Sequence, residues 1–178
     1  LICGLDNPDQ KAIALMFIAN FVKEQGCIRI GIVAPYLGYM RQDKSFNPGE
    51  VVTSKIFAKF LSEHFDWLVT IDPHLHRYNS LSDIYSIPAK ALHAAASIAT
   101  WVVNNVSNPI LIGPDSESDQ WVSEIAGLSG LPYIIMEKKR YSDVDVSISS
   151  PDLDSYRNCS PVILDDIIST GRTMIEVI

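Results

Sequence analysis

Short apolar runs alternate along this chain with stretches in which apolar residues recur every third or fourth position. Apolar residues at helical spacing predict helices over residues 9–25, 52–65, 90–104 and 119–128 and from residue 172 onward. Short runs rich in apolar and β-branched residues predict strands at residues 1–3, 28–35, 67–72, 109–115, 131–137 and 161–166. Polar and apolar residues alternate over residues 143–149, which favours a hairpin or an edge strand.

Local signals mark the ends of two of these helices. Gly26 follows the first helical pattern and is typical of a helix C-terminus, where the backbone adopts positive φ. The second pattern begins beside Thr53 and Ser54, and either hydroxyl is a candidate N-cap because it could accept a hydrogen bond from the first free backbone N–H groups.

Strands that alternate with helices indicate an α/β fold in which a mainly parallel sheet is flanked by helices. The pattern runs twice, so we expect two similar α/β halves, residues 1–88 and 89–178, with a boundary near Pro88. The chain begins at Leu1 within a predicted strand and stops at Ile178 within a predicted helix. We therefore expect it to be truncated at both ends.

Composition narrows the classes of function. The 178 residues are 47% hydrophobic and carry a net charge of −7, so the chain can bury a core and lacks the basic excess of a nucleic-acid groove. Small phosphorylated ligands stay possible, because they need only a few local cations or backbone amides. No apolar run has the length of a membrane span. Three scattered cysteines without a CxxC pair indicate reduced thiols in a cytoplasmic protein.

Polar and charged residues gather at the carboxyl ends of five predicted strands. Ligands of open α/β sheets bind beyond these ends, so the pattern predicts a site built from several loops. The five stretches are RQD (41–43), DPHLH (72–76), PD (114–115), EKKR (137–140) and DDIISTGRT (165–173).

The last stretch has the chemistry of a sugar-phosphate site. A turn rich in Gly, Ser and Thr at a helix start, residues 169–173, points several backbone N–H groups into one concavity that suits a phosphate. Asp165 and Asp166 directly before it supply acceptors for a pair of sugar hydroxyls. The alternative is an N-capped helix preceded by two exposed acids. The spacing of a Walker A loop is absent.

VILDDIISTGRT resembles the phosphoribosyl-diphosphate (PRPP) loop shared by type I phosphoribosyltransferases and ribose-phosphate pyrophosphokinases, also called PRPP synthetases. PYLGYMRQDKSFNPGEVVTSK, residues 35–55, is similar to a segment that occurs in the pyrophosphokinases and has no counterpart in the transferases. The chain therefore resembles the ribose-phosphate pyrophosphokinase family, which implies two phosphoribosyltransferase-like halves. The first half would bind ATP and the second ribose 5-phosphate.

The resemblance implies roles for residues of both halves. Arg41 and Gln42, with Asp43 beside them, fall on the ATP-binding positions. His74 and Asp115 fall on the positions that hold Mg²⁺, although SESDQW after GPD replaces the family's usual glycines.

The remaining roles concern the sugar phosphate. EKKRYSDVDV, residues 137–146, resembles the flexible catalytic loop of the family and puts Lys138 and Arg140 on its catalytic positions, with Arg140 also on the sugar phosphate. The residues implied to bind ribose 5-phosphate are Arg140, Asp165, Asp166, Ser169, Thr170, Gly171, Arg172 and Thr173.

The activity implied by the resemblance is transfer of the β,γ-diphosphate of ATP to the 1-hydroxyl of ribose 5-phosphate, with release of AMP. A neighbouring subunit would complete the adenine pocket, which implies a homo-oligomer with a shared ATP site. Two alternatives stay open. One is a phosphoribosyltransferase that consumes PRPP. The other is a non-catalytic regulatory homologue, which the SESDQW sequence and Arg172 in place of a second glycine leave possible.

Overall fold

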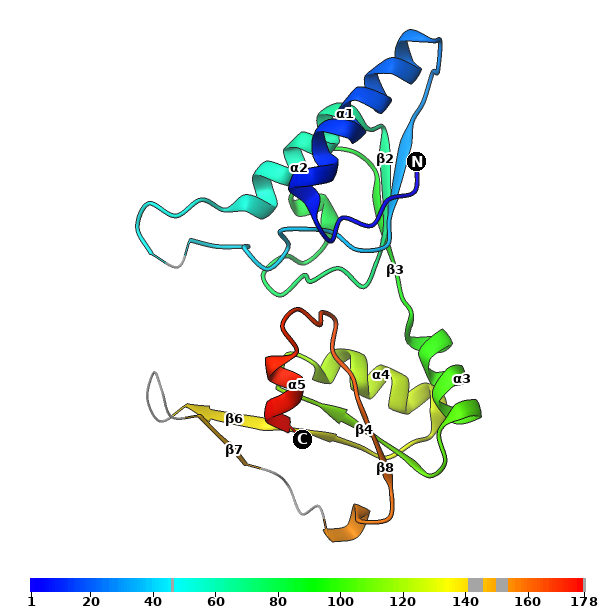
Figure 1. Ribbon diagram of the computed structural model, residues 1–178, viewed down its shortest axis with the longest axis vertical. Helices are drawn as coiled ribbons and strands as arrows, with labels where there is room; N and C mark the ends of the chain where they lie inside the picture. The colour runs from blue at the N-terminus through cyan, green and yellow to red at the C-terminus, as the bar shows by residue number, and fades with distance from the viewer. Residues whose placement is uncertain (46, 141–145, 150–153, 178) are drawn as a thin grey trace. The chain divides into compact units, whose positions relative to one another are not determined.

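The computed structural model describes residues 1–45, 47–140, 146–149 and 154–177. The chain forms two compact units, unit 1 from Leu1 to His93 and unit 2 from Ala94 to Ile178. Each unit has its own sheet and its own core (Figure 1).

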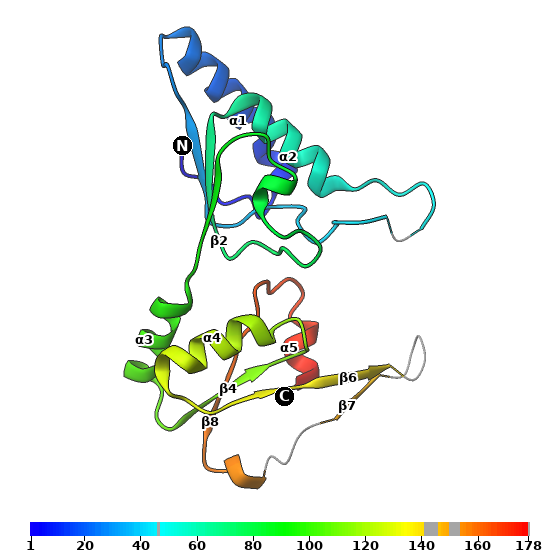
Figure 2. The same ribbon diagram turned by 180° about the vertical axis from the view of Figure 1, so that it is seen from behind.

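Unit 1 is a parallel sheet covered by two helices (Figures 1 and 2). The strands pair in the order β1-β2-β3, all parallel, and Ile2 adds an isolated parallel bridge to Val33. Its elements are α1 (Pro8–Glu24), β1 (Gly31–Ala34), α2 (Thr53–His64), β2 (Trp67–Ile71), the 3₁₀ turn η1 (Leu81–Asp83) and β3 (Ala89–Leu92).

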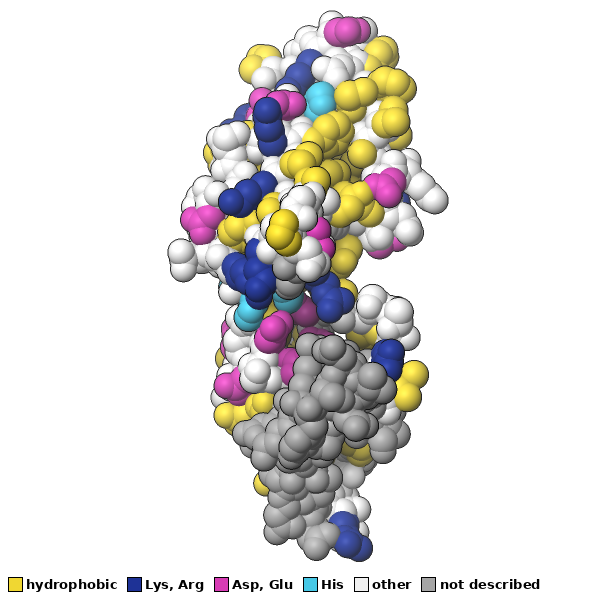
Figure 3. Space-filling view, turned by 90° about the vertical axis from the view of Figure 1, so that its left-hand side faces the viewer, with side chains coloured by type: hydrophobic (Ala, Val, Ile, Leu, Met, Phe, Trp, Pro, Cys, Tyr) yellow, Lys and Arg dark blue, Asp and Glu magenta, His cyan; other side chains and the backbone are white. Residues whose placement is uncertain are grey.

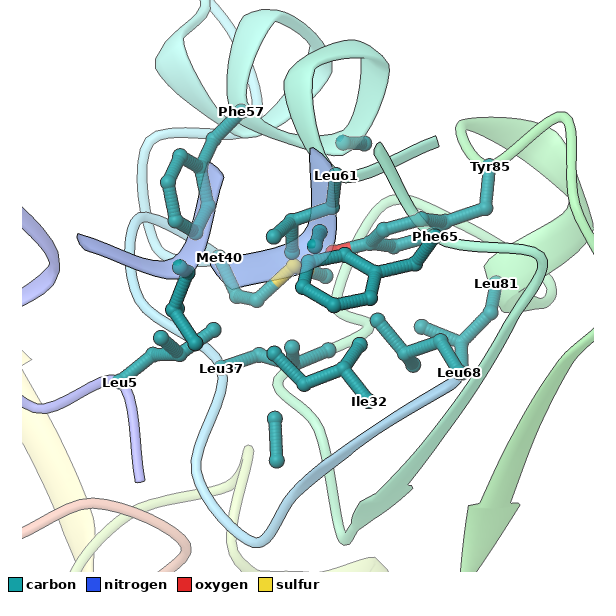
Figure 4. Close-up of a cluster of buried hydrophobic side chains, with 14 of the residues drawn as sticks. Leu5, Ile32, Leu37, Met40, Phe57, Leu61, Phe65, Leu68, Leu81 and Tyr85 are labelled. Atoms are coloured by element: carbon teal, nitrogen blue, oxygen red, sulfur yellow. The ribbon is translucent and has the colours of Figure 1, made fainter. Parts of the chain in front are cut away.

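The core of unit 1 lies between the sheet and its helices. Leu15 and Ala19 are the buried residues of α1, and Phe57 and Leu61 come from α2. Burial of side chains of this size contributes roughly 1.5–3 kcal/mol each. Figure 4 shows how ten residues of the cluster interdigitate, and these are Leu5, Ile32, Leu37, Met40, Phe57, Leu61, Phe65, Leu68, Leu81 and Tyr85.

Unit 2 has a parallel sheet in the order β5-β4-β8 and a separate antiparallel hairpin of β6 with β7. Ile110 and Leu111 alternate on β4, so they belong to clusters on opposite faces of the sheet. The elements are α3 (Ala95–Asn105), β4 (Pro109–Gly113), α4 (Asp119–Ser129), β5 (Tyr133–Ile135), β6 (Glu137–Arg140), β7 (Val146–Ser149), the 3₁₀ turn η2 (Asp154–Tyr156), β8 (Ser160–Ile163) and α5 (Arg172–Val177).

The predicted α/β class with mainly parallel sheets flanked by helices is confirmed. The hairpin predicted around residues 143–149 is confirmed in its described part, where β7 pairs with β6. Gly26 has φ +93, as its predicted place after the first helix requires. Among the described residues, no helix combines the length and hydropathy needed to cross a membrane.

Two local predictions are wrong. Residues 90–92 were expected to begin a helix, but they lie in β3, because Leu68–Ile71 of β2 offers this short segment a parallel partner. Neither Thr53 nor Ser54 caps α2, since the N-cap position falls on Val52 and no side chain bonds there. The Ser54 hydroxyl bonds the carbonyl of Gln42 instead, a tertiary contact that local sequence does not encode.

We expect Gly31→Ala to destabilise unit 1. Gly31 pairs with Trp67 across β1 and β2, and a Cβ at this position would overlap the indole ring. Overpacking of this kind costs roughly 1–3 kcal/mol of unfolding free energy. Gly127→Ala is the matched control, because a Cβ there meets nothing and alanine in α4 should gain about 0.5–1 kcal/mol. Denaturant unfolding measures both, and an unchanged Gly31→Ala variant would contradict the packing.

Candidate functional site

The loop after β1 carries the predicted nucleotide-binding residues Arg41, Gln42 and Asp43. Arg41 is exposed and Gln42 half-buried, but Asp43 is buried, with 6% of its surface exposed. Arg77 Nη1 donates a hydrogen bond to Asp43 Oδ1 at 2.7 Å, and the two side chains form an ion pair. Asp43 Oδ2 is buried without a hydrogen-bond partner among the described residues. Arg77 therefore compensates a carboxylate that would otherwise be strongly destabilising.

Hydrogen bonds from two hydroxyl groups hold the loop that follows β1. Ser54 Oγ donates to the carbonyl of Gln42 at 2.9 Å and lies 2.8 Å from Tyr78 Oη. Tyr78 Oη also donates to the carbonyl of Asp43 at 3.2 Å. Because Arg77 and Tyr78 follow β2, these contacts join the segments that leave two adjacent strands.

Two residues near the predicted site residues in sequence have a strained backbone. Tyr39 has φ +64 and Asp72 has φ +37, and in the described chain only Asn108 is another non-glycine residue with positive φ. Such conformations cost about 1 kcal/mol or more each and persist where the surrounding structure imposes them. Asp72 is held from β3, since its N–H donates to the carbonyl of Leu92 at 3.0 Å and its Oδ1 lies 3.1 Å from His93 Nδ1.

The predicted metal ligand His74 lies in the segment after β2. Its ring centroid is 6.1 Å from that of His76. Within the described residues, no three side chains from His, Cys, Asp and Glu form a group suited to hold a metal ion. The second predicted ligand, Asp115, belongs to unit 2, so joint coordination by these two residues stays a prediction.

In unit 2, Asp115 follows β4 and organises the start of α4. The N–H groups of Glu117 and Ser118 donate to Asp115 Oδ1 at 3.0 and 3.2 Å. Ser118 is fully buried, and its hydroxyl donates to the carbonyl of Asp115 at 2.6 Å. In SESDQW, which replaces the glycines of the family pattern, the serine before Asp119 therefore closes the turn that holds this carboxylate.

Asp165 and Asp166 follow β8, which lies beside β4 in the sheet. The N–H of Asp166 donates to Asp165 Oδ1 at 3.0 Å. Burial, and after it the negative charges of Asp166 and Asp115, raise the pKa of Asp165 to about 6. The parallel pairing of β4 with β8 thus brings Asp115 near enough to Asp165 and Asp166 for its negative charge to raise the pKa of Asp165.

The predicted phosphate turn occupies residues 169–173 and leads directly into α5. Ser169 and Thr170 are exposed, and Gly171 has φ +73, a conformation that glycine adopts without strain. The N–H of Arg172 donates to Thr170 Oγ1 at 3.3 Å. The turn follows Asp166 closely in sequence, so the acidic pair and the turn belong to one segment of unit 2.

Lys138 and Arg140 lie on β6, and the flexibility expected for residues 137–146 stays a prediction. Their backbone pairs with Ile148 and Val146 of β7, and this pairing fixes residues 137–140 as a strand. Residues 141–145, the rest of the expected loop between the two strands, lie outside the described residues.

Four residues hold these loops by hydrogen bonds that were not predicted from the sequence: Ser54, Arg77, Tyr78 and His93. Arg77 directly follows DPHLH, so its position beside a polar strand end was a usable signal. The pairing of Arg77 with Asp43 left no signal in the sequence, because it joins residues from different loops.

Two family models match the chain in succession. The model of the N-terminal domain of ribose phosphate pyrophosphokinase matches residues 1–64, and the model of the phosphoribosyl transferase domain matches residues 80–178. The second match begins at residue 80, before the boundary predicted near Pro88, so that boundary stays a prediction.

Two curated relatives and one solved structure are similar to the chain over most of its length. The chain is 31% identical over 170 residues to the ribose-phosphate pyrophosphokinase of Methanopyrus kandleri, covering 94% of this chain and 57% of that protein. It is 33% identical over 169 residues to that of Methanothermobacter thermautotrophicus, covering 94% and 58%. The phosphoribosylpyrophosphate synthetase of Mycobacterium smegmatis shares the fold, with a TM-score of 0.80, 20% identity and coverage of 99% and 57%. The chain thus spans less than two thirds of these relatives.

The raised pKa of Asp165 predicts a pH dependence of stability. Folded unit 2 keeps this proton up to a pKa of about 6, whereas an unfolded aspartate releases it near its ordinary value of 3.8. The folded state therefore binds more protons between these values, and its stability should fall as the pH rises from about 4 to 6. Asp165→Asn should flatten this slope in denaturant unfolding at a series of pH values. Glu124→Gln, at an exposed position on α4, serves as control, and an equal slope in wild type and Asp165→Asn would refute the assignment.

Proposed function

We propose that this chain, which belongs to the ribose-phosphate pyrophosphokinase family, forms part of an enzyme that makes PRPP. The reaction would transfer the β,γ-diphosphate of ATP to the 1-hydroxyl of ribose 5-phosphate and release AMP. Because the chain spans about three fifths of the curated relatives it matches, the proposal concerns the full-length protein. The observation that carries it is the acidic pair and hydroxyl-rich turn after β8 in a chain matched by both family models.

Unit 2 is the proposed ribose 5-phosphate site. Asp165 and Asp166 would accept hydrogen bonds from two ring hydroxyls, which orients the sugar and presents its 1-hydroxyl. The backbone N–H groups of residues 169–173 would bind the 5-phosphate, together with the hydroxyls and Arg172. Ser169 and Thr170 are exposed and therefore accessible to a ligand. A sugar held at both ends has little freedom left before the transfer.

Unit 1 is the proposed ATP site, with Arg41 and Gln42 as direct ligands. The exposed guanidinium of Arg41 suits polyphosphate oxygens, and the amide of Gln42 suits polar edges of the nucleotide. We restrict the proposed role of Asp43, because its carboxylate is buried on Arg77. It would position Arg41 and Gln42 from within the loop and would not itself contact ATP.

Magnesium is the proposed cation. Carboxylate oxygens are the preferred donors of this cation, and its positive charge beside Asp115 would oppose the negative charges that act on Asp165. Asp115 would hold it in unit 2, and His74 is the proposed ligand from unit 1. When bound, the cation supplies neutralisation of the polyphosphate charge.

Lys138 and Arg140 are the proposed catalytic cations. Phosphoryl transfer depends on positioning and on neutralisation of the charge that develops on the transferring group and its leaving oxygen. A positioned cation in a closed site contributes on the order of 3–4 kcal/mol to transition-state stabilisation. Arg140 would in addition contact the sugar phosphate.

The family resemblance further suggests a homo-oligomer in which a neighbouring subunit completes the adenine pocket. No role with nucleic acid or membranes is proposed, since the sequence is acidic overall.

Incubation of the full-length protein with ATP, Mg²⁺ and ribose 5-phosphate tests the proposal. We expect equimolar AMP and PRPP. A phosphoribosyltransferase would instead consume added PRPP with a base, and a regulatory homologue would bind nucleotide without releasing AMP. Either result would overturn the proposed reaction.

Lys138→Ala should lower kcat by on the order of 10²–10³-fold, the loss that follows removal of one group stabilising transition-state charge. The KM for ATP should change little, because the proposed contact forms mainly in the transition state. Steady-state kinetics of AMP release measure both values. Lys139→Ala, one position along the same strand, is the control, and equal losses in kcat and ATP affinity for Lys138→Ala would contradict its role.

Arg77→Met should raise the KM for ATP by roughly tenfold, equivalent to about 1.4 kcal/mol of binding free energy. The substitution leaves Asp43 buried and unpaired, so the loop that carries Arg41 and Gln42 should lose its fixed geometry. The double variant Arg77→Met/Asp43→Asn removes the charge and should recover much of the stability lost. A destabilised variant with an unchanged KM would show that the pair supports folding alone.

A further inference from the structure

The chain leaves β2 through a residue with an unusual backbone. Asp72 directly follows Ile71, the last residue of β2, and has φ +37, in the left-handed region. A residue other than glycine adopts this conformation at a cost in backbone free energy. Pro73 restricts Asp72 further, because a proline ring crowds the N–H and Cβ of the residue before it. Contacts from outside this turn must therefore hold Asp72 in place.

Two contacts from the end of β3 hold Asp72. Its N–H donates to the carbonyl of Leu92 at 3.0 Å, which continues the parallel pairing of β2 with β3 by one residue. Its Oδ1 lies 3.1 Å from Nδ1 of His93. The first contact uses a backbone carbonyl, which any residue at position 92 would supply. The second depends on the side chain of His93.

The chemistry of the two side chains determines the direction of their hydrogen bond. An ionised carboxylate can only accept, so Nδ1 of His93 carries the hydrogen and donates it to Asp72. The Asp72 side chain is 19% exposed and that of His93 is 66% exposed. All four histidines of the chain belong to unit 1, and Figure 3 shows histidine side chains at its surface. His93 can therefore be substituted without disturbing the core.

The segment after Asp72 is held at both ends. In this part of the described chain, no helix or strand lies between Ile71 and Leu81, so sheet and helix bonds do not fix it. Asp72 is bonded to the end of β3, and Arg77 and Tyr78 are bonded to Asp43. The proposed metal ligand, His74, lies between these two anchors and is half-buried.

We propose that His93 is a positioning residue: by holding Asp72, it fixes the turn that presents His74 to Mg²⁺. Its role rests on the proposed function, in which His74 binds this cation. His93 itself would not contact the metal. Mg²⁺ requires near-ideal octahedral geometry, so a ligand on an irregular segment depends on anchors of this kind.

Two substitutions of His93 separate the hydrogen bond from the bulk of the side chain. His93→Leu removes the donor. His93→Asn keeps a donor in nearly the same place, because the amide nitrogen of asparagine is bonded to Cγ, as Nδ1 is in histidine. Lys90→Leu, at an exposed position on β3, is the matched control.

Calorimetric titration of the full-length protein with Mn²⁺ measures the metal site without turnover. His93→Leu should weaken Mn²⁺ binding by about tenfold, as is typical when a group that orients a metal ligand is lost. His93→Asn and Lys90→Leu should bind Mn²⁺ as the wild type does. Thermal melting close to that of the wild type establishes that each variant folds.

Kinetics give a second measurement on the same variants. The Mg²⁺ concentration for half-maximal AMP release should rise about tenfold in His93→Leu. The value of kcat at saturating Mg²⁺ should stay close to that of the wild type, because the cation then occupies its site. A role in folding alone would not change the Mg²⁺ dependence.

A double variant tests whether His93 acts through His74. His74→Ala should itself weaken Mn²⁺ binding. His93→Leu should cause no further loss in that background, because the ligand that it positions is gone. Two losses that add would mean that His93 contributes by another route, and they would overturn the positioning role.

Two other results would overturn the role of His93 alone: a His93→Leu variant that binds Mn²⁺ as the wild type does, or a His93→Asn variant as weak as His93→Leu. Unchanged Mn²⁺ binding in His74→Ala would overturn it together with the proposed metal site. Failure of the proposed reaction is seen separately, as a wild type that releases no AMP. The Mn²⁺ titrations decide the role of His93 in that case as well.

Discussion

Parallel pairing of β4 with β8 determines the chemistry available in unit 2. It sets the residues after both strands at one edge of the sheet, where burial of Asp165, and after it the negative charges of Asp166 and Asp115, raise the pKa of Asp165 to about 6. Such a group is destabilising for the fold alone. It becomes useful when a cation or a set of sugar hydroxyls engages the oxygens, and this requirement connects the sheet topology to the proposed ligand.

In unit 1 a buried carboxylate has a positively charged neighbour, unlike Asp165 in unit 2. Asp43 is buried and neutralised by Arg77, and the hydroxyls of Ser54 and Tyr78 fix the backbone on either side of it. The ion pair therefore stabilises the geometry of this loop. The exposed Arg41, two residues earlier, is then presented from a loop that is held at several points.

Periodicity was sufficient to predict the fold class because parallel sheets with helical crossovers leave a strong pattern. It failed at residues 90–92, where a short apolar run was compatible with a helix or a strand and the parallel partner in β2 decided the outcome. The polar residues at strand ends also led us to predict functional roles for Asp115 and Asp165, and these roles stay predictions. The role of Ser54 was assigned wrongly and Arg77 was missed, because their bonds to Gln42 and Asp43 join distant segments and sequence spacing contains no such information.

Because sequence spacing contains no information on tertiary contacts, the exposed apolar face of α1 could not be predicted. A helix with apolar residues on every side looks like an ordinary core helix until its surroundings are known. The structure shows that Leu15 and Ala19 fill the space available in unit 1, which leaves Ile13, Phe17 and Phe21 in water.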